Sequence, residues 1–284
     1  MSIKRVGIVG SGIMGTGIAE VAAATGHEVL LRSRTDAGAQ AMRDRLEKSL
    51  NRQVERERKT ESERDDILGR VEVTSKLKDL ASSDIVIESV IEDRGVKRAL
   101  FAELDEACTD AVVLATNTST LAVVELAMET KRPDRVCGIH FFNPAPVMAL
   151  VELVRPITAS DDTMDVARRF ATECNKETVE VKDEAGFVVN ALLFPYLNNA
   201  ARLLEGGVAT KEGIDAAMVG GCGFPMGPFA LFDLVGLDTS LAILDALYEE
   251  HREPNYAAVP LLRRMVAAQH LGRKTGHGFY DYRS

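Results

Sequence analysis

A histidine and an acidic residue are the two side chains of this sequence that could together move a proton. His140 follows the apolar run of residues 136–139, and Glu152 lies within the apolar run of residues 149–154. An isolated carboxylate is costly to bury, so Glu152 requires a partner, and a histidine suits it. The imidazole can take a hydroxyl proton while the carboxylate orients the ring and stabilises its positive charge. The pair fits the oxidation of an alcohol, although a lone histidine beside two phenylalanines is often structural.

Asn117, Thr118 and Ser119 form a second group of polar side chains. They follow a strand that is predicted to end near Ala115. The carboxyl ends of the strands normally build the active crevice of a doubly wound sheet, so these residues and His140 are expected there. The alternative for Ser119 is a cap on a helix that starts near Leu121.

Glycines near the N-terminus predict a binding site for a dinucleotide. The sequence GSGIMG at residues 10–15 follows a short apolar strand and opens a helical run that reaches about residue 24. In this setting Gly10 permits a tight turn, Gly12 lets the backbone approach a pyrophosphate, and Gly15 allows the helix to pack closely on the sheet. The free amides around Ile13 and Met14 would face the phosphates at the positive end of the helix dipole.

The end of the second predicted strand, residues 28–32, lacks the acidic residue that usually accepts hydrogen bonds from the adenosine ribose. Ser33 and Arg34 stand there instead. A carboxylate would repel a 2′-phosphate, whereas these two side chains could bind one through charge-assisted hydrogen bonds. The sequence therefore favours NADP(H) over NAD(H). Asp36 could supply the missing acid, but its place after Thr35 at a helix start indicates a helix cap.

Apolar strands alternate with helical stretches through residues 1–183. Further buried strands are predicted at residues 85–87, 111–114, 136–139 and 150–154. This alternation predicts an α/β fold whose first domain, residues 1–183, holds a doubly wound, Rossmann-type and mostly parallel sheet. Strand-like runs disappear from Gly186 onward, so residues 184–284 are expected to form a second, all-helical domain.

Residues 37–69 predict a pair of charged helices that projects from the sheet, with a break near residues 59–60. Acidic residues are interleaved with basic ones, which is typical of a solvated helix face. A docking surface for a phosphorylated ligand is the alternative. The basic residues are Arg43, Arg45, Lys48, Arg52, Arg56, Arg58 and Lys59.

The composition limits the partners and the compartment of the protein. A net charge of −9 over 284 residues argues against broad binding to nucleic acids or membrane surfaces. No apolar run approaches the roughly 18 to 20 residues that span a bilayer, and the N-terminus lacks a secretion-signal pattern, so we expect a cytoplasmic protein. The widely spaced Cys108, Cys137, Cys174 and Cys222 are expected to be small buried side chains, with no disulfide framework or metal site.

A set of motifs, taken in order, indicates a family. They are GSGIMG at residues 10–15, IESVIED at 87–93, NTS at 117–119, HFFNP at 140–144, GFVVN at 186–190 and LGRKTGHGFY at 271–280. From end to end the chain resembles the 3-hydroxyacyl-CoA dehydrogenase family, and within it the single-function enzymes that act on 3-hydroxybutyryl-CoA. The resemblance implies hydride transfer between a nicotinamide cofactor and the 3-hydroxyl carbon of a CoA-linked acyl group, which gives a 3-oxoacyl-CoA such as acetoacetyl-CoA.

The resemblance also implies roles for individual residues. His140 is expected to be the catalytic acid or base, with Glu152 as its orienting partner. Ser119 and Asn190 match residues that bind substrate oxygens near the reacting carbon, and Asn190 would do so from the helical domain. The matches to cofactor contacts are Glu92, Lys97, Asn117 and Lys274, and the matches to coenzyme A contacts are Ser49 and Arg56, where a lysine is common. The helical domain forms the dimer interface in the family, so a homodimer is expected.

Two other functions stay open at this point. The same chemistry could act on a hydroxyacyl group that is attached to an acyl carrier protein, because both donors present pantetheine. A dinucleotide-binding protein without catalysis is the second alternative, but it would not need His140, Glu152, Ser119 and Asn190 together.

Overall fold

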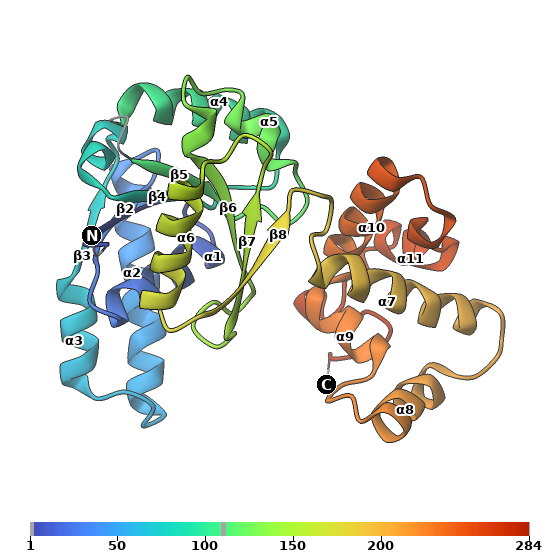
Figure 1. Cartoon of the computed structure of the whole chain (residues 1–284). Helices are drawn as coiled ribbons and strands as arrows, with labels where there is room; N and C mark the ends of the chain where they lie inside the picture. Colours follow the sequence, from blue (N-terminus) through green and yellow to red (C-terminus); the bar gives the residue numbers. More distant parts are fainter. Residues whose placement is uncertain (1–2, 109–111, 284) are drawn as a thin grey trace. The chain divides into compact units, whose positions relative to one another are not determined.

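The computed structural model describes residues 3–108 and 112–283 of the chain. The chain divides into two compact units, Met1–Asp183 and Glu184–Ser284, which Figure 1 shows in blue to yellow and in yellow to red. No helix among the described residues has both the length and the apolar character needed to cross a membrane.

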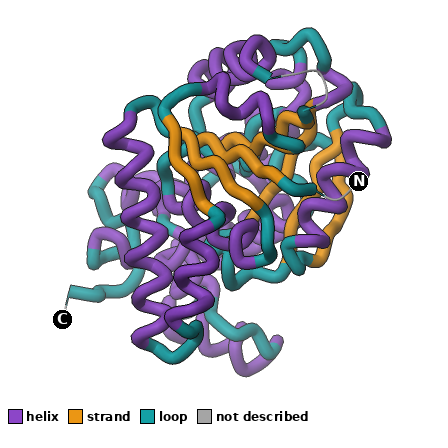
Figure 2. The backbone as a smooth tube through the Cα atoms, turned by 90° about the vertical axis from the view of Figure 1, so that its left-hand side faces the viewer, coloured by secondary structure: helices purple, strands orange, loops and turns teal. Residues whose placement is uncertain are grey.

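The first unit is built on a single sheet, drawn in orange in Figure 2. Over the described residues it has eight strands in the order β3-β2-β1-β4-β5-β6-β7-β8. Every pairing is parallel except that of β6 with β7. The predicted doubly wound, mostly parallel sheet is confirmed. The strands are β1 (Arg5–Val9), β2 (Glu28–Arg32), β3 (Val71–Thr74), β4 (Ile85–Glu88), β5 (Val113–Thr116), β6 (Val136–Phe141), β7 (Leu150–Arg155) and β8 (Glu177–Lys182).

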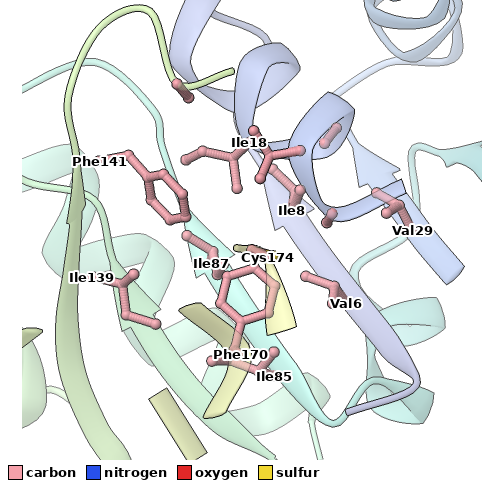
Figure 3. Close-up of a cluster of buried hydrophobic side chains, with 14 of the residues drawn as sticks. Val6, Ile8, Ile18, Val29, Ile85, Ile87, Ile139, Phe141, Phe170 and Cys174 are labelled. Carbon is pink, nitrogen blue, oxygen red and sulfur yellow. The ribbon is translucent and has the colours of Figure 1, made fainter. Parts of the chain in front are cut away.

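Helices cover both faces of this sheet. On one face, side chains of α1, α2 and α6 pack on alternate strand residues such as Ile8, Ile87 and Ile139. Figure 3 shows Ile18 of α1 and Phe170 of α6 in this cluster. On the other face, η1 approaches so closely that a Cβ on Gly7 would collide with the Leu80 side chain, and Val123 of α5 packs close to Gly138. The helices of this unit are α1 (Ile13–Ala24), α2 (Asp36–Glu55), α3 (Glu61–Gly69), α4 (Arg94–Ala107), α5 (Val123–Ala127) and α6 (Asp161–Glu173), with the 3₁₀ turns η1 (Leu77–Ser82) and η2 (Pro133–Arg135).

Several strand predictions need correction. β3 and β8 were not predicted, because their exposed positions carry charged residues and they lack the continuous apolar runs of the inner strands. β5 begins two residues later than the predicted 111–114, whose first residue lies outside the described residues. β6 continues through Phe141, so His140 lies inside the strand and does not follow it.

The predicted charged helix pair is formed by α2 and α3, which pack side by side at the left of Figure 1. A Thr–Glu capping box at Thr60 and Glu63 starts α3 and explains the break between the two helices. The prediction that Asp36 caps α2 is wrong. The cap is Thr35, whose hydroxyl accepts a hydrogen bond from the Gly38 amide, and Asp36 lies in the first turn of the helix.

The second unit is helical over its described residues, as predicted. Its C-terminal segment wraps around the buried Asp233, whose carboxylate accepts hydrogen bonds of 2.8 Å from the amides of Phe279 and Tyr280. A Cβ on Gly272 or Gly278 would collide with Asp233, which explains two glycines of the LGRKTGHGFY motif. The helices are α7 (Val189–Glu205), α8 (Lys211–Cys222), α9 (Pro228–Val235), α10 (Leu237–His251) and α11 (Pro260–Ala267), with η3 (Pro254–Tyr256) and η4 (Arg273–Thr275).

The cysteines follow their predicted environment in three of the four positions. Cys108, Cys137 and Cys174 are buried, and burial raises the pKa of the Cys137 thiol to about 12. These thiols are therefore protonated and unreactive at neutral pH. The expectation for Cys222 is wrong, because this residue ends α8 with its side chain exposed.

Candidate active site

The two-residue period of the strands gathers polar side chains on one face of the sheet, near the carboxyl ends of β4, β5 and β6. Glu88 and Thr116 are in-register neighbours on β4 and β5. His140 and Glu152 are directly opposite each other on the antiparallel strands β6 and β7. Because successive strand residues point to opposite faces, these four side chains share the face covered by η1 and α5.

His140 and Glu152 form the buried pair that the sequence predicted. Nδ1 of His140 lies 2.8 Å from Oε2 of Glu152, and both side chains are at most 5% exposed. With the proton on Nδ1, the ring donates to the carboxylate and turns Nε2 the other way. Ser119 Oγ lies 3.1 Å from that Nε2. The three residues are thus connected in one line, carboxylate to imidazole to hydroxyl.

Ser119 lies in a loop that Glu92 organises. One carboxylate oxygen of Glu92 accepts hydrogen bonds from the amides of Ser119 (2.9 Å) and Thr120 (3.2 Å) and from the hydroxyl of Thr118. Burial opposes the ionisation of Glu92, but the Lys97 ammonium and these hydrogen bonds outweigh it, so the pKa of Glu92 lies below its usual value. The loop is therefore folded around a negative charge.

Ser119 does not cap the following helix. α5 begins at Val123, and the carboxylate of Asp183 accepts hydrogen bonds from the amides of Val123 (2.8 Å) and Val124 (2.7 Å). The alternative of a structural cap for Ser119 is therefore wrong, and its hydroxyl faces His140 instead.

Lys97, predicted as a cofactor contact, lies in a buried bridge between two acids. Its ammonium is 2.7 and 2.9 Å from the two oxygens of Glu88 and 3.1 Å from Glu92. Glu88 was not predicted as a site residue, although a carboxylate at the end of the buried run 85–87 should have signalled a charged partner. Asn117 connects the loop after β5 to strand β6, because its side-chain oxygen accepts a 2.8 Å hydrogen bond from the amide of Phe141, the residue after His140.

The glycine-rich loop between β1 and α1 fits a dinucleotide phosphate group. Gly10 has a φ of 133°, and a Cβ there would collide with the Ser89 carbonyl, while a Cβ on Gly15 would collide with the Gly10 carbonyl. A Cβ on Gly12 would meet nothing within 4 Å, so the protein itself gives no reason for a glycine at this position. A ligand that approaches the backbone there supplies one.

The start of α1 has the properties that an anion requires. The N-cap residue of α1 is Gly12, so no N-cap side chain binds the first amides of the helix, and no acidic residue lies in its first turn. These amides are therefore available to a phosphate. Ile13 at this start is 76% exposed. The loop lies at the point where strand order reverses between β1 and β4, which is where doubly wound sheets bind their ligands.

Ser33 and Arg34 follow β2 at the same edge of the sheet. The Ser33 amide donates a 3.1 Å hydrogen bond to the Thr74 carbonyl, and its side chain lies against Gly38 at the start of α2. Ser33 is half-buried and Arg34 is exposed. Their use in selecting a cofactor stays a prediction.

The two residues matched to coenzyme A contacts lie on α2 and at its end. The hydroxyl of Ser49 donates a 3.1 Å hydrogen bond to the buried Glu20 on α1, which also accepts 2.7 Å from Gln53. Arg56 is exposed at the C-cap. Sequence reasoning missed Glu20, which joins α2 to α1.

Asn190 and Lys274 belong to the second unit. Asn190 lies in the first turn of α7, and Lys274 lies in η4, where its ammonium forms an ion pair with Asp238 at 2.5 Å. Their approach to substrate and cofactor stays a prediction. The described residues contain no cluster of side chains suited to hold a metal ion.

Comparisons with known proteins agree over both units. The family models "3-hydroxyacyl-CoA dehydrogenase, NAD binding domain" and "3-hydroxyacyl-CoA dehydrogenase, C-terminal domain" match residues 5–184 and 186–282. A 3-hydroxybutyryl-CoA dehydrogenase of Mycobacterium tuberculosis is 50% identical over 283 residues, 99% of each chain. The crystal structure of M. tuberculosis FadB2 has a TM-score of 0.97 at 50% identity and covers 99% of this chain and 100% of that one. The structure of (S)-3-hydroxybutyryl-CoA dehydrogenase PaaH1 from Ralstonia eutropha has a TM-score of 0.96 at 42% identity, with 100% of both chains covered.

The glycine contacts predict that Gly12→Ala and Gly15→Ala fail in different ways. The free energy of unfolding of Gly12→Ala should lie within about 1 kcal/mol of the wild-type value, because the new methyl group has room. The variant should nevertheless bind a nicotinamide dinucleotide at least about tenfold more weakly. Gly15→Ala should lose stability, because its Cβ meets the Gly10 carbonyl. Urea denaturation and fluorescence titration of the cofactor measure the two effects. Unchanged cofactor affinity in Gly12→Ala would contradict the assignment of the loop.

The lowered pKa of Glu92 predicts how its contribution to stability depends on pH. The ionised carboxylate stabilises the fold above the unfolded glutamate pKa of about 4.3, and this stabilisation is lost as the pH falls through the lower folded value. Glu92→Gln should therefore lower the free energy of unfolding by about 1–2 kcal/mol at pH 7 and by much less at pH 3. Urea denaturation at both pH values measures this difference. An equal loss at pH 7 and pH 3 would show that the charge of Glu92 is irrelevant.

Proposed function

Because the chain belongs to the 3-hydroxyacyl-CoA dehydrogenase family, we propose that it interconverts a short-chain 3-hydroxyacyl-CoA and the corresponding 3-oxoacyl-CoA, with 3-hydroxybutyryl-CoA and acetoacetyl-CoA as the pair. Family membership confirms the resemblance that the motifs indicated. The chain is a nicotinamide-dependent dehydrogenase, as are the relatives that it matches over its whole length. The single observation that supports the proposed chemistry is the buried His140–Glu152 pair with the Ser119 hydroxyl beside Nε2 of His140.

His140 is the residue that would exchange a proton with substrate. In oxidation, Nε2 takes the proton of the 3-hydroxyl group, and Glu152 stabilises the positive charge that the ring gains. In reduction, the same nitrogen returns a proton to the new alkoxide oxygen. A bound nicotinamide cofactor supplies the acceptor or donor of the hydride. The Ser119 hydroxyl lies where it can hold the reacting oxygen against Nε2, and Asn190 would add a second contact from the helical unit.

The residues at the end of β2 support NADP(H) as the favoured cofactor. The side chain of Ser33 and the exposed guanidinium of Arg34 stand where an acid would accept hydrogen bonds from the ribose. A guanidinium binds a phosphate through paired, charge-assisted hydrogen bonds. Glu92, Lys97, Asn117 and Lys274 stand at the other cofactor positions of the proposal.

We assign the remaining contacts to the two helical regions. The charged surface of α2, with Ser49 and Arg56, would receive the coenzyme A moiety. The second unit, residues 184–284, would complete the substrate site and form a homodimer. Exposed apolar side chains on its helices support a partner surface there, among them Leu192 on α7 and Val219 on α8. The sequence pattern also leads us to propose a cytoplasmic location.

Replacing the catalytic histidine tests the proposed chemistry. His140→Ala should lower kcat for acetoacetyl-CoA reduction by about 10²- to 10⁴-fold, the usual loss of acid–base catalysis, and leave cofactor affinity nearly unchanged. His251→Ala, at the C-terminal end of α10, is the matched control and should keep wild-type activity. Steady-state assays and cofactor titration measure the effects. A fully active His140→Ala variant, or wild-type protein that reduces acetoacetyl carrier protein and not acetoacetyl-CoA, would refute the proposal.

The cofactor preference is tested at Ser33. Parallel assays with NADPH and NADH should give the higher kcat/KM with NADPH in the wild type. Ser33→Asp should move the preference toward NADH, because the carboxylate accepts hydrogen bonds from the ribose and repels a 2′-phosphate. The expected change in the ratio of kcat/KM values is at least about tenfold, the effect of about one charged hydrogen bond. A ratio that does not move would show that the end of β2 does not select the cofactor.

A further inference from the structure

A buried chain of charges and hydrogen bonds runs from β4 to the loop that holds Ser119. It begins at Glu88, which is fully buried at the end of β4. The Glu88 carboxylate accepts hydrogen bonds from Lys97 (2.7 and 2.9 Å), from the Thr116 hydroxyl (2.7 Å) and from the Val90 amide (2.6 Å). This set of donors suits an ionised carboxylate that is held in one position.

Lys97 transmits the position of Glu88 to Glu92. An ammonium has three N–H donors, and the three acceptor distances at Lys97 are two to Glu88 and one to Glu92. The side chain is 1% exposed, so water does not compete for these donors. Lys97 sits one turn into α4, whose start is capped by the Asp93 carboxylate through the Val96 amide. The ammonium is therefore fixed by both its helix and its two acids.

Glu92 and Thr116 then hold the Ser119 loop from two sides. Glu92 binds the amides of Ser119 and Thr120, as described above. The Thr116 hydroxyl, which donates to Glu88, also accepts a 3.2 Å hydrogen bond from the Thr118 amide. Both routes start at Glu88 and end at the backbone on either side of the Ser119 hydroxyl.

We propose that Glu88 is a positioning residue of the active site, which sets the place of the Ser119 hydroxyl beside His140 Nε2 through Lys97, Glu92 and Thr116. The proposal rests on the proposed function for the role of Ser119 and adds to it a residue that never touches substrate. Its effect reaches the substrate oxygen through the loop backbone. Loss of the Glu88 charge leaves Lys97 with one acid, frees the amides of Ser119 and Thr120 to exchange, and lets the hydroxyl leave Nε2.

The test compares Glu88→Gln and Thr116→Val with a control on α4, the helix that carries Lys97. Asp105, near the C-terminal end of α4, forms a buried ion pair with Arg132 at 3.0 Å, so Asp105→Asn also removes one charge of a buried pair, away from the Ser119 loop. Thr116→Val keeps the volume of the side chain and removes only the hydroxyl, which keeps the test available if Glu88→Gln does not fold. All variants are measured as the full chain.

Two measurements separate a positioning role from a purely structural one. The first is kcat and KM for acetoacetyl-CoA and for the cofactor, and the second is amide hydrogen exchange of Ser119 and Thr120 in protein without ligands. Glu88→Gln and Thr116→Val should lower kcat by about tenfold and speed exchange of both amides by about tenfold, as expected when a charge-assisted hydrogen bond is lost. Asp105→Asn should lower stability and leave both measurements at wild-type values.

The proposal is overturned if Glu88→Gln and Thr116→Val lose stability as the control does but keep wild-type kcat and wild-type exchange of the two amides. It is also overturned if kcat falls while exchange is unchanged, because the loop would then not be the route. Failure of the proposed function looks different. In that case the wild-type protein does not turn over acetoacetyl-CoA, and the exchange rates still decide whether Glu88 holds the loop.

Discussion

The site depends on the antiparallel pairing of β6 with β7, within a sheet whose other described pairings are parallel. In the register of this pair, His140 and Glu152 are direct cross-strand neighbours, and Nδ1 of His140 lies 2.8 Å from Oε2 of Glu152. The register matters because a slip of one residue would turn one of the two side chains to the other face. The rest of the unit positions what these two residues meet. The Ser119 loop comes from β5, and the glycine-rich loop opens at the strand-order reversal between β1 and β4.

The sequence was a good guide where a local rule has a physical cause. Continuous apolar runs predicted the inner strands, and the glycine spacing predicted a loop whose Gly10 and Gly15 have no room for a Cβ. The demand of a buried carboxylate for a partner predicted the pairing of Glu152 with His140. The outer strands β3 and β8 escaped prediction because their charged, partly exposed residues look like those of loops and helices. Cys222 was misjudged for a related reason, since exposure depends on tertiary packing.

What the sequence did not reveal is how buried charges are shared. Glu88 and Lys97 are nine positions apart, on a strand and the following helix, and no local pattern says that they meet. The same holds for Glu20 and Ser49, which join α1 to α2. Removing such pairs from water costs free energy, and their attraction offsets this cost only when every donor and acceptor has a partner, as at Lys97. They therefore fix the geometry of a site more than they add to stability, and only a structure shows them.

The central claim is that Nδ1 of His140 donates a hydrogen bond to Glu152, while Nε2 exchanges a proton with the substrate oxygen. Nitrogen-15 NMR of the labelled His140 ring, in protein without ligands at a pH where the ring is neutral, reads this directly. The account predicts a proton on Nδ1, in a hydrogen bond to Glu152, and an unprotonated Nε2 that accepts a hydrogen bond from the Ser119 hydroxyl. A neutral ring with its proton on Nε2 would contradict the account, because that nitrogen could not then receive the proton of an alcohol.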